Sequence, residues 1–323
     1  MASNEESGMG ADETGLVADI GRQSVRFGLS GGACGLAPRA VQHFNTADHP
    51  TFTSALVAYL RQMGLENRTL PSALAIAGAV RGDVVNMTGS RWYISLTGVE
   101  AVLRARPTAL NECAAVALAL TQLPDSVFMP LPGPTMRPAR PGGTFLLVGP
   151  GTGLGVSALV TAGDRFVPVQ SEAAHMTFAA RTPEEARIVD YLARKARPAS
   201  NEALLSGAGL VTAYEALSDG NTLAPEEITR SAARDPIAHA ALTTFIGALG
   251  SVIGDLVLAF GAWDGVFLTG AISRALHHQL ADPLLRRRMT DKAAFGRQLA
   301  EVPITVVNRN DLELLGAAAA LAG

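Results

Sequence analysis

The chain has 323 residues, of which 48% are hydrophobic and 17% are charged, and its formal net charge is −3. This length exceeds the usual size of a single hydrophobic core, so two lobes are expected, and the apolar content excludes a globally disordered chain. The slightly negative charge, with Arg286-Arg287-Arg288 as the one basic run, argues against nucleic acid or a membrane surface as a partner.

The cysteines and the N-terminal residues favour the cytoplasm. Cys34 and Cys113 have neither zinc-ligand spacing nor a disulfide framework around them, which suits a reducing compartment. Residues 1–14 are polar and acidic and are predicted to be a disordered tail. They lack the basic and apolar regions of a signal peptide, so they are not expected to be one. The longest apolar stretch, at 245–263, is broken by glycines and Asp255, which predicts a buried helix rather than a membrane span. We therefore expect a soluble cytoplasmic protein.

The spacing of apolar residues predicts the secondary structure. In chain order, the expected elements are a strand hairpin at 15–20 and 25–30, a helix at 51–63, a strand at 73–78, a helix at 111–123, a strand at 144–148, helices at 183–193 and 237–261, a strand at 265–269 and a helix at 311–322. Prolines between Pro124 and Pro141 predict a connector on the surface. Two sets of strands followed by helices indicate an α/β protein with two similar lobes.

Two segments that contain glycine lie at the ends of predicted strands. In Asp19-Ile-Gly21-Arg22-Gln23, the glycine lets backbone N–H groups approach phosphate oxygens, and an aspartate there can hold hydrated Mg²⁺. Gly149-Pro-Gly-Thr152-Gly153-Leu-Gly155 has four glycines in seven residues and a hydroxyl donor at Thr152. Taken alone, the first segment is more typical of an ordinary turn, and the second is equally compatible with a tight hairpin that binds nothing.

Three further side chains suit a polyol ligand. Glu172 and His175 combine a carboxylate with an imidazole, and sugar hydroxyls both donate and accept hydrogen bonds. A zinc site would need more histidine or cysteine ligands nearby, and the sequence has none there. In isolation, the two residues are more typical of a surface pair, and Glu202 of the start of a helix.

These segments occur in an order that resembles the bacterial glucokinases of the actin-like hexokinase superfamily. The resemblance runs from Leu16 to Leu321 and is carried by stretches that are specific in combination, namely Ala75–Gly78, Gly149–Gly155, Leu205–Leu210 and Leu314–Ala319. It implies two actin-like ATPase lobes around a cleft that binds glucose and Mg–ATP, usually in a homodimer. The domains expected on this basis are a small one at 15–110 plus 310–323 and a large one at 111–309.

The resemblance also implies roles for individual residues. The first loop, with Asp19, Gly21, Arg22 and Gln23, would cradle the β- and γ-phosphates, and Asp19 would hold Mg²⁺ through water. Thr152 and Gly153 would grip the triphosphate, and Gly270 would lie near the adenosine. Asn111 would bind the sugar, and Glu112 would accept the proton of its 6-hydroxyl. The remaining sugar contacts would come from Glu172, His175 and Glu202.

Several positions depart from the family pattern. The proton acceptor is Glu112 instead of Asp, and its extra methylene shifts the carboxylate by roughly 1.5 Å. A misplacement of about 1 Å costs on the order of 10²-fold in rate, so reduced but measurable activity is expected. In the first loop, Arg22 replaces Gly and Gln23 replaces Thr. Gly89 replaces an Asn, and Ala173-Ala174 replaces a Gly-Gly pair.

These departures leave alternatives to a glucokinase that phosphorylates the 6-hydroxyl of glucose. One is a catalytically silent sugar-binding paralogue that acts as a sensor or partner protein, as the joint change at Arg22, Gln23 and Glu112 suggests. Another is a kinase for a different acceptor, such as an amino sugar or a ketose. The sequence does not decide among them, because one displaced hydroxyl contact is enough to change substrate preference.

Overall fold

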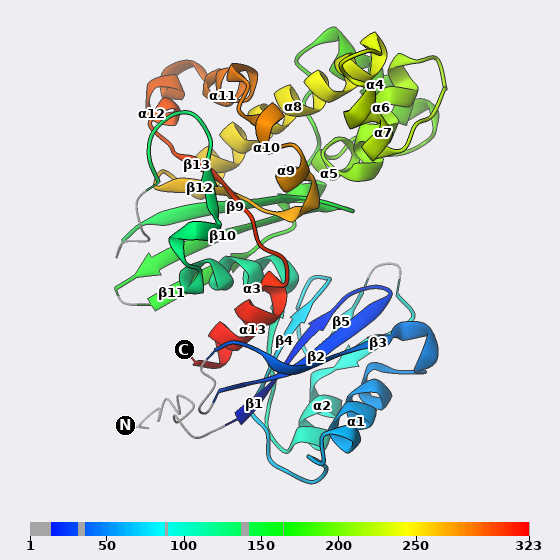
Figure 1. Cartoon of the computed structure of the whole chain (residues 1–323), viewed down its shortest axis with the longest axis vertical. Helices are drawn as coiled ribbons and strands as arrows, with labels where there is room; N and C mark the ends of the chain where they lie inside the picture. The colour runs from blue at the N-terminus through cyan, green and yellow to red at the C-terminus, as the bar shows by residue number, and fades with distance from the viewer. Residues whose placement is uncertain (1–13, 32–35, 88–89, 137–141, 164, 323) are drawn as a thin grey trace. The chain divides into compact units, whose positions relative to one another are not determined.

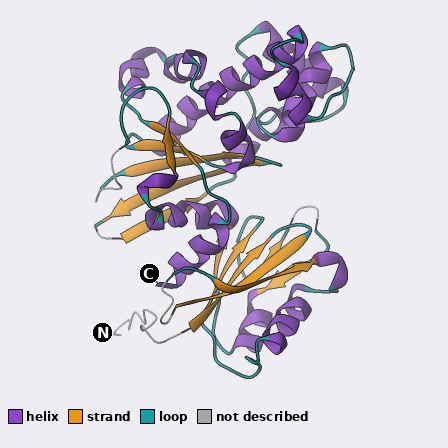
Figure 2. Cartoon of the chain, viewed as in Figure 1, coloured by secondary structure: helices purple, strands orange, loops and turns teal. Residues whose placement is uncertain are grey.

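The computed structural model describes residues 14–322 apart from 32–35, 88–89, 137–141 and 164. The acidic tail up to residue 13, Cys34 and Gly89 therefore lie outside the described residues, whereas Thr14 already begins the first strand. The chain divides into two compact units, one of residues 1–123, 165–170 and 309–323 and the other of 124–164 and 171–308. Both are α/β units, and Figures 1 and 2 show helices packed on the sheet in each.

The first unit contains a five-stranded sheet in the order β3-β2-β1-β4-β7. Its elements are β1 (Thr14–Ile20), β2 (Ser24–Gly31), β3 (Arg39–Asn45), α1 (Phe52–Gln62), β4 (Ser72–Ile76), β5 (Val84–Asn86), β6 (Tyr93–Ser95), α2 (Leu96–Leu103), β7 (Thr108–Asn111), α3 (Glu112–Ala119), β11 (Arg165–Gln170) and α13 (Leu312–Ala322), with short 3₁₀ turns at Thr46–Asp48 and Leu120–Gln122. The predicted hairpin at 15–20 and 25–30 is confirmed as β1 and β2, which pair antiparallel.

The period-2 alternation of β1 builds a core on each face of this sheet. Leu16, Ala18 and Ile20 pack into the cluster that contains α1, whereas Val17 packs with residues of α13 on the opposite face. Helix α1 is the predicted helix at 51–63, and it begins where Thr51 accepts a hydrogen bond from the Ser54 backbone. The sheet is therefore covered on both sides, as expected for strands that are almost entirely apolar.

The compact units do not coincide with the predicted domain ranges. Residues 111–123 and 165–170 go with the first unit, although they fall within the predicted large domain at 111–309. The physical reason for the first difference is the packing of α3 on α13, where a methyl group at Gly316 would overlap the Ala115 carbonyl. Two helices in such close contact belong to one core, wherever they lie in the sequence.

The second unit repeats the strand arrangement of the first. Its elements are β8 (Phe128–Pro130), β9 (Thr144–Pro150), β10 (Leu154–Ala162), α4 (Pro183–Arg194), α5 (Asn201–Leu204), α6 (Gly207–Leu217), α7 (Pro225–Ser231), α8 (Pro236–Phe260), β12 (Gly265–Leu268), α9 (Gly270–Ala275), α10 (His277–Leu280), α11 (Pro283–Thr290), α12 (Gly296–Ala300) and β13 (Ile304–Val307), with 3₁₀ turns at Asp125–Val127, Ala173–His175 and Ala293–Phe295. Strand β9 pairs antiparallel with β10 and parallel with β12, just as β1 pairs with β2 and β4.

The proline-rich connector does more than run over the surface. Phe128–Pro130 forms β8, which pairs antiparallel with β13, and Leu131 is buried. Prolines are tolerated there because β8 is an edge strand, which pairs with β13 on one side and so needs backbone donors on that side alone. Residues 137–141 of the connector lie outside the described part of the chain.

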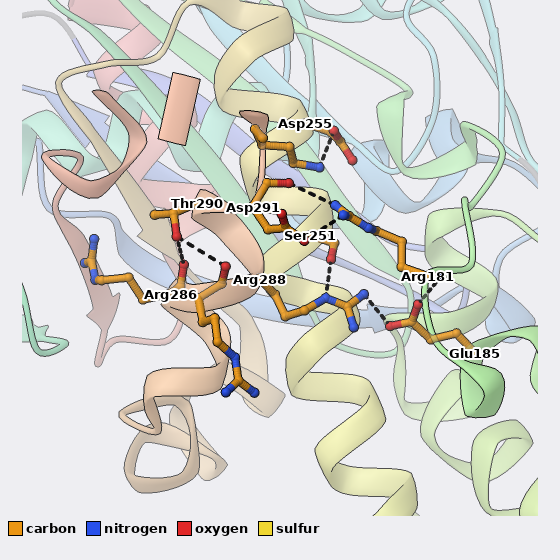
Figure 3. A network of polar contacts seen from close by, with 10 residues as sticks. Arg181, Glu185, Ser251, Asp255, Arg286, Arg288, Thr290 and Asp291 are labelled. Atoms are coloured by element: carbon orange, nitrogen blue, oxygen red, sulfur yellow. Dashed lines mark hydrogen bonds and ion pairs between the residues drawn. The ribbon is translucent and has the colours of Figure 1, made fainter. Parts of the chain in front are cut away.

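Helix α8 is the central helix of the second unit, and α6, α7 and α11 pack against it. Within the described residues it is one helix that is long and apolar enough to cross a membrane, but 78% of its most apolar window is buried inside the protein. The predicted buried helix at 237–261 is thus confirmed. Figure 3 shows polar contacts beside α8, where Arg288 of α11 joins Ser251 of α8 to Glu185 of α4.

Candidate active site

The first candidate phosphate loop is the turn between β1 and β2. The Gly21 N–H donates to the Ser24 carbonyl at 2.9 Å, and the Thr46 N–H donates to the Gln23 carbonyl at the same distance. These hydrogen bonds fix the backbone of the turn, while the side chains of Arg22 and Gln23 are exposed. A guanidinium and an amide at this position can both donate to phosphate oxygens.

Asp19 lies next to this turn, on β1, and faces Arg26 on β2 in the strand register. The Arg26 Nε donates to Asp19 Oδ2 at 2.8 Å, and the same guanidinium contacts Asp311 and Glu313 at the start of α13. Burial and the nearby Glu313 raise the pKa of Asp19 to about 6, although Arg26 opposes this rise. The carboxyl is therefore held in a fixed direction inside a cluster with excess negative charge.

Asn111 and Glu112 lie at the junction of β7 and α3. Asn111 is the N-cap of α3, because its Oδ1 accepts a hydrogen bond from the Ala114 N–H at 2.8 Å. The Asn111 N–H donates to Oε1 of Gln170 at 2.9 Å, so the backbone is fixed as well. Glu112 is exposed in the first turn of α3, where the helix dipole favours a negative charge.

The strand register brings these two groups to one edge of the first sheet. Ile20 lies opposite Ile76, and Ile76 lies opposite Asn111. Because β1, β4 and β7 are parallel, their carboxyl ends meet at the same edge, and the two ends that carry Asp19 and Asn111 are separated by one strand, or roughly 10 Å. This edge of an α/β sheet is where ligands usually bind.

In the second unit, the glycine-rich segment is a tight turn between β9 and β10. The Gly151 N–H donates to the Gly153 carbonyl at 2.8 Å, and the Gly207 N–H at the start of α6 donates to the Gly151 carbonyl at 2.8 Å. Gly270 packs directly on this turn: its φ is +84°, and a methyl group there would overlap the Pro150 carbonyl. The predicted contributors Thr152, Gly153 and Gly270 are thus brought together within the unit.

Glu202, on α5, contacts the same turn. Its Oε2 accepts a hydrogen bond from the Leu154 N–H at 3.0 Å. Glu172 and His175 flank a 3₁₀ turn, with 4.0 Å between Glu172 Oε2 and His175 Nε2, and about half of each side chain is exposed. Asn201, the neighbour of Glu202, donates from its backbone to the Met176 carbonyl and from Nδ2 to the Ala173 carbonyl. The three predicted sugar contacts of this unit therefore lie on two connected segments.

Two residues that touch the predicted site residues were missed by sequence reasoning. Arg26 could have been found, because a hairpin that turns at 21–23 places it opposite Asp19. Gln170 follows from no local pattern, since it is far from Asn111 in sequence and bonds to its backbone. Among the described residues, no group of three or more His, Cys, Asp or Glu side chains is arranged to hold a metal ion.

Comparisons with known proteins identify the family and the fold. A family model described as Glucokinase matches residues 16–323. A glucokinase of Stenotrophomonas maltophilia (strain K279a) is 35% identical over 315 residues, which cover 94% of this chain and 93% of that protein. The structure of a glucokinase from an Antarctic psychrotroph covers 96% of this chain and 98% of its own, with a TM-score of 0.81 and 27% identity.

A more distant structure shares the fold. A glucokinase from Balamuthia mandrillaris, solved in complex with glucose, has a TM-score of 0.79 at 19% identity, and the match covers 96% of this chain and 93% of that one.

Proposed function

Because this chain belongs to the glucokinase family, we propose that it transfers the γ-phosphoryl group of ATP to the 6-hydroxyl of glucose. The comparisons confirm the predicted family and the predicted actin-like sugar kinase fold. They also confirm the predicted class of activity, that of an ATP-dependent hexose kinase. The alternative of a silent sugar sensor is not favoured by these findings. The observation that carries the proposal is the Asn111-Glu112 pair at the edge of the sheet that also ends in the Asp19 turn.

The acceptor hydroxyl is proposed to be activated by Asn111 and Glu112. Since Asn111 Oδ1 caps α3, its amide is oriented, and Nδ2 can donate to a sugar hydroxyl. The Glu112 carboxylate accepts the proton of the 6-hydroxyl as that oxygen attacks phosphorus. Phosphoryl transfer depends mostly on positioning and charge stabilisation, so the orientation of this side chain decides the rate.

The other hydroxyl groups of the sugar are assigned to Glu172, His175 and Glu202. Carboxylates accept hydrogen bonds from hydroxyl groups, whereas a neutral imidazole both donates and accepts. Ala173 and Ala174, which stand where the family has glycines, are the first two residues of the 3₁₀ turn and are buried. Their methyl groups therefore pack into the protein, which supports glucose rather than an altered acceptor.

The triphosphate is assigned to the two glycine-containing turns. The N–H groups around Gly21 and the Thr152-Gly153 segment would bind phosphate oxygens, and Gly270 leaves room for the nucleoside beside the second turn. Arg22 and Gln23 are exposed on the first turn, so they are able to extend along the phosphates instead of filling the space next to the backbone. We assign Arg22 to the neutralisation of phosphate charge.

Magnesium is proposed as the metal of the Mg–ATP substrate. Both contacts of Arg26 with Asp19 involve Oδ2, and 16% of the Asp19 side chain is exposed, so Oδ1 lies outside those contacts and suits a water ligand of Mg²⁺. The residues present therefore fit a cation held mainly by phosphates. When bound, Mg²⁺ supplies charge neutralisation on the phosphate oxygens.

A coupled assay of ADP formation over a panel of hexoses tests the proposed function. We expect turnover with glucose, and a loss of roughly 10²–10⁴-fold in kcat for Glu112→Gln, which keeps the shape but cannot accept the proton. Glu66→Gln, an exposed carboxylate on the same unit, is the matched control and should behave as wild type. The absence of ADP formation with every hexose at millimolar concentration would contradict the proposal.

The departures from the family pattern are tested by reversion. Glu112→Asp should raise turnover sharply, whereas Arg22→Gly should lower it, because it removes the guanidinium assigned to the phosphates. An unchanged rate for both variants would mean that the assigned positions are not those of the reaction. We also propose a cytoplasmic homodimer, as is usual in the family. Light scattering on the purified protein, at concentrations that bracket those of the assay, tests the dimer.

A further inference from the structure

Glu202 has a contact that sugar binding alone does not require. Its Oε2 accepts a hydrogen bond from the N–H of Leu154, the first residue of β10, at 3.0 Å. A methyl group at Gly153 would lie 2.5 Å from the same oxygen, which is closer than such atoms approach. Gly153 is not in the left-handed region, so its role here is to leave space for the carboxylate rather than to allow a special φ.

The turn that Glu202 contacts is the one assigned to the triphosphate. Its other contacts come from backbone: the Gly207 N–H donates to the Gly151 carbonyl, and Gly270 packs on the Pro150 carbonyl. The Glu202 side chain can rotate, whereas those contacts move with the elements that carry them. A change in the position of this carboxylate would therefore reach the turn directly.

Glu202 is also connected to the segment that bears Glu172 and His175. Its helix, α5, is capped by Ser200, and Asn201 binds the carbonyls of Ala173 and Met176 on either side of the 3₁₀ turn. A carboxylate has about four lone-pair directions, so Glu202 can accept hydrogen bonds from the Leu154 N–H and from a sugar hydroxyl together. The Glu202 carboxylate then contacts both the sugar and the turn assigned to the triphosphate.

We propose that Glu202 is a positioning residue that couples the two substrates: sugar binding to its carboxylate fixes the hydrogen bond to Leu154 and so sets the Gly151–Leu154 turn for the triphosphate. This inference rests on the proposed function and deepens it. Coupling of this kind is reciprocal, so the sugar raises the affinity for the nucleotide by the same factor as the nucleotide raises the affinity for the sugar.

Isothermal calorimetry on the full chain tests the coupling. The dissociation constant of glucose is measured with and without a saturating non-hydrolysable ATP analogue plus Mg²⁺, and the ratio of the two is the coupling factor. We expect a factor of roughly 5–20 for the wild type, within the usual range for coupled sites. A factor of 1 would overturn the inference, even if the protein phosphorylates glucose normally.

Two variants remove the contact in different ways. Gly153→Ala displaces the carboxylate by its methyl group, and Glu202→Asp keeps the charge but is roughly 1.5 Å too short to reach Leu154. In both, the coupling factor should fall to within about twofold of 1. Glu226→Asp, at an exposed carboxylate on α7 of the same unit, is the matched control for Glu202→Asp and should keep the wild-type factor.

A double-mutant cycle separates this effect from a direct clash with phosphate. If Gly153→Ala acts through the carboxylate, it should change nucleotide affinity in the wild type but not in the Glu202→Ala background. An equal loss in both backgrounds would overturn the inference. Failure of the proposed function looks different, because the wild type would then form no ADP with any hexose, whatever its coupling factor.

Discussion

The Arg26 Nε donates a hydrogen bond to Asp19 Oδ2 at 2.8 Å, across the hairpin that ends in the first candidate phosphate turn. The same guanidinium contacts Asp311 and Glu313 at the start of α13, so one cation serves three carboxylates. It joins the first strand of the unit to its last helix, at the position where Asp19 has its proposed role. The charge of Arg26 is therefore important both for stability and for the direction of the Asp19 carboxylate.

Replacement of Arg26 by alanine should destabilise the protein by about 2–3 kcal/mol, because it leaves three carboxylates close together with their cation removed. Urea unfolding at neutral pH measures the change. The control is Arg61→Ala, which breaks an exposed pair with Glu66 and should cost less than about 1 kcal/mol. Equal effects of the two substitutions would show that the Arg26 cluster contributes no more than a surface ion pair.

The stability of the protein should depend on pH through Asp19. Its pKa in the folded protein is about 6, against 3.8 for the ordinary carboxyl, because burial disfavours the charge and Glu313 repels it. The folded state therefore keeps a proton that the unfolded state loses, and the free energy of unfolding falls as the pH rises from about 4 to 6. This contribution is on the order of 2–3 kcal/mol and is fully present below about pH 4.

Asp19→Asn provides the reference for this pH dependence, since the amide does not titrate. The free energy of unfolding of the variant minus that of the wild type should increase by about 2–3 kcal/mol between pH 4 and pH 7. Urea titrations at four or five pH values measure it. A difference that stays constant over this range would mean that Asp19 titrates alike in both states.

Helix packing around α8 gives a further prediction. A methyl group at Gly250 would overlap the Leu285 carbonyl of α11, and backbone cannot move aside as a flexible side chain can. Gly250→Ala should therefore cost about 3 kcal/mol or more, as overpacking does. Gly247→Ala, one turn earlier, meets its nearest neighbour at 3.6 Å and should be neutral or stabilise the helix by up to about 1 kcal/mol. Thermal unfolding of both variants tests the pair, and similar melting temperatures would contradict it.

The buried ion pair between Glu185 and Arg288 should behave differently from surface pairs. Glu185 is fully buried, and its Oε1 accepts from Arg288 at 2.7 Å (Figure 3). Glu185→Ala leaves a nearly buried cation unpaired and should cost about 3–5 kcal/mol. The double variant Glu185→Leu/Arg288→Met should cost less than Glu185→Leu or Arg288→Met alone. Arg187→Ala, which breaks the exposed pair with Asp219, is the control and should cost under about 1 kcal/mol. A double variant as unstable as the sum of its parts would refute this account.

The sequence predicted the elements that have local signals. The helix at 51–63 was predicted from apolar residues at helical spacing, and the structure shows that both it and the helix at 111–123 begin at a capping side chain, Thr51 and Asn111 respectively. Strand β8 was missed, since three residues among prolines form a strand only when β13 is available as a partner. Pairing of this kind depends on residues distant in sequence, and no local pattern encodes it.

The candidate site likewise has a part that could be predicted from the sequence and a part that could not. The resemblance to the glucokinase family is what predicts Asn111, Glu112 and the two glycine-containing turns as site residues, because each segment taken alone is compatible with an ordinary turn. The hydrogen bond between Glu202 and Leu154 spans 48 positions in the sequence and could not be predicted from either segment alone. The placement of α3 in the first unit likewise depends on its contact with α13, almost 200 residues later.

The close contact of α8 with α11 also has a consequence during synthesis. Gly250 and Gly254 of α8 lie against backbone carbonyls of Leu285 and Met289, so this face is covered only after α11 has been translated. At roughly 5–20 residues per second, a ribosome needs a few seconds to proceed from the end of α8 to the end of α11. During that interval the 25-residue apolar helix α8 lacks α11, which later packs on it. It would then be a binding site for a chaperone that recognises apolar segments.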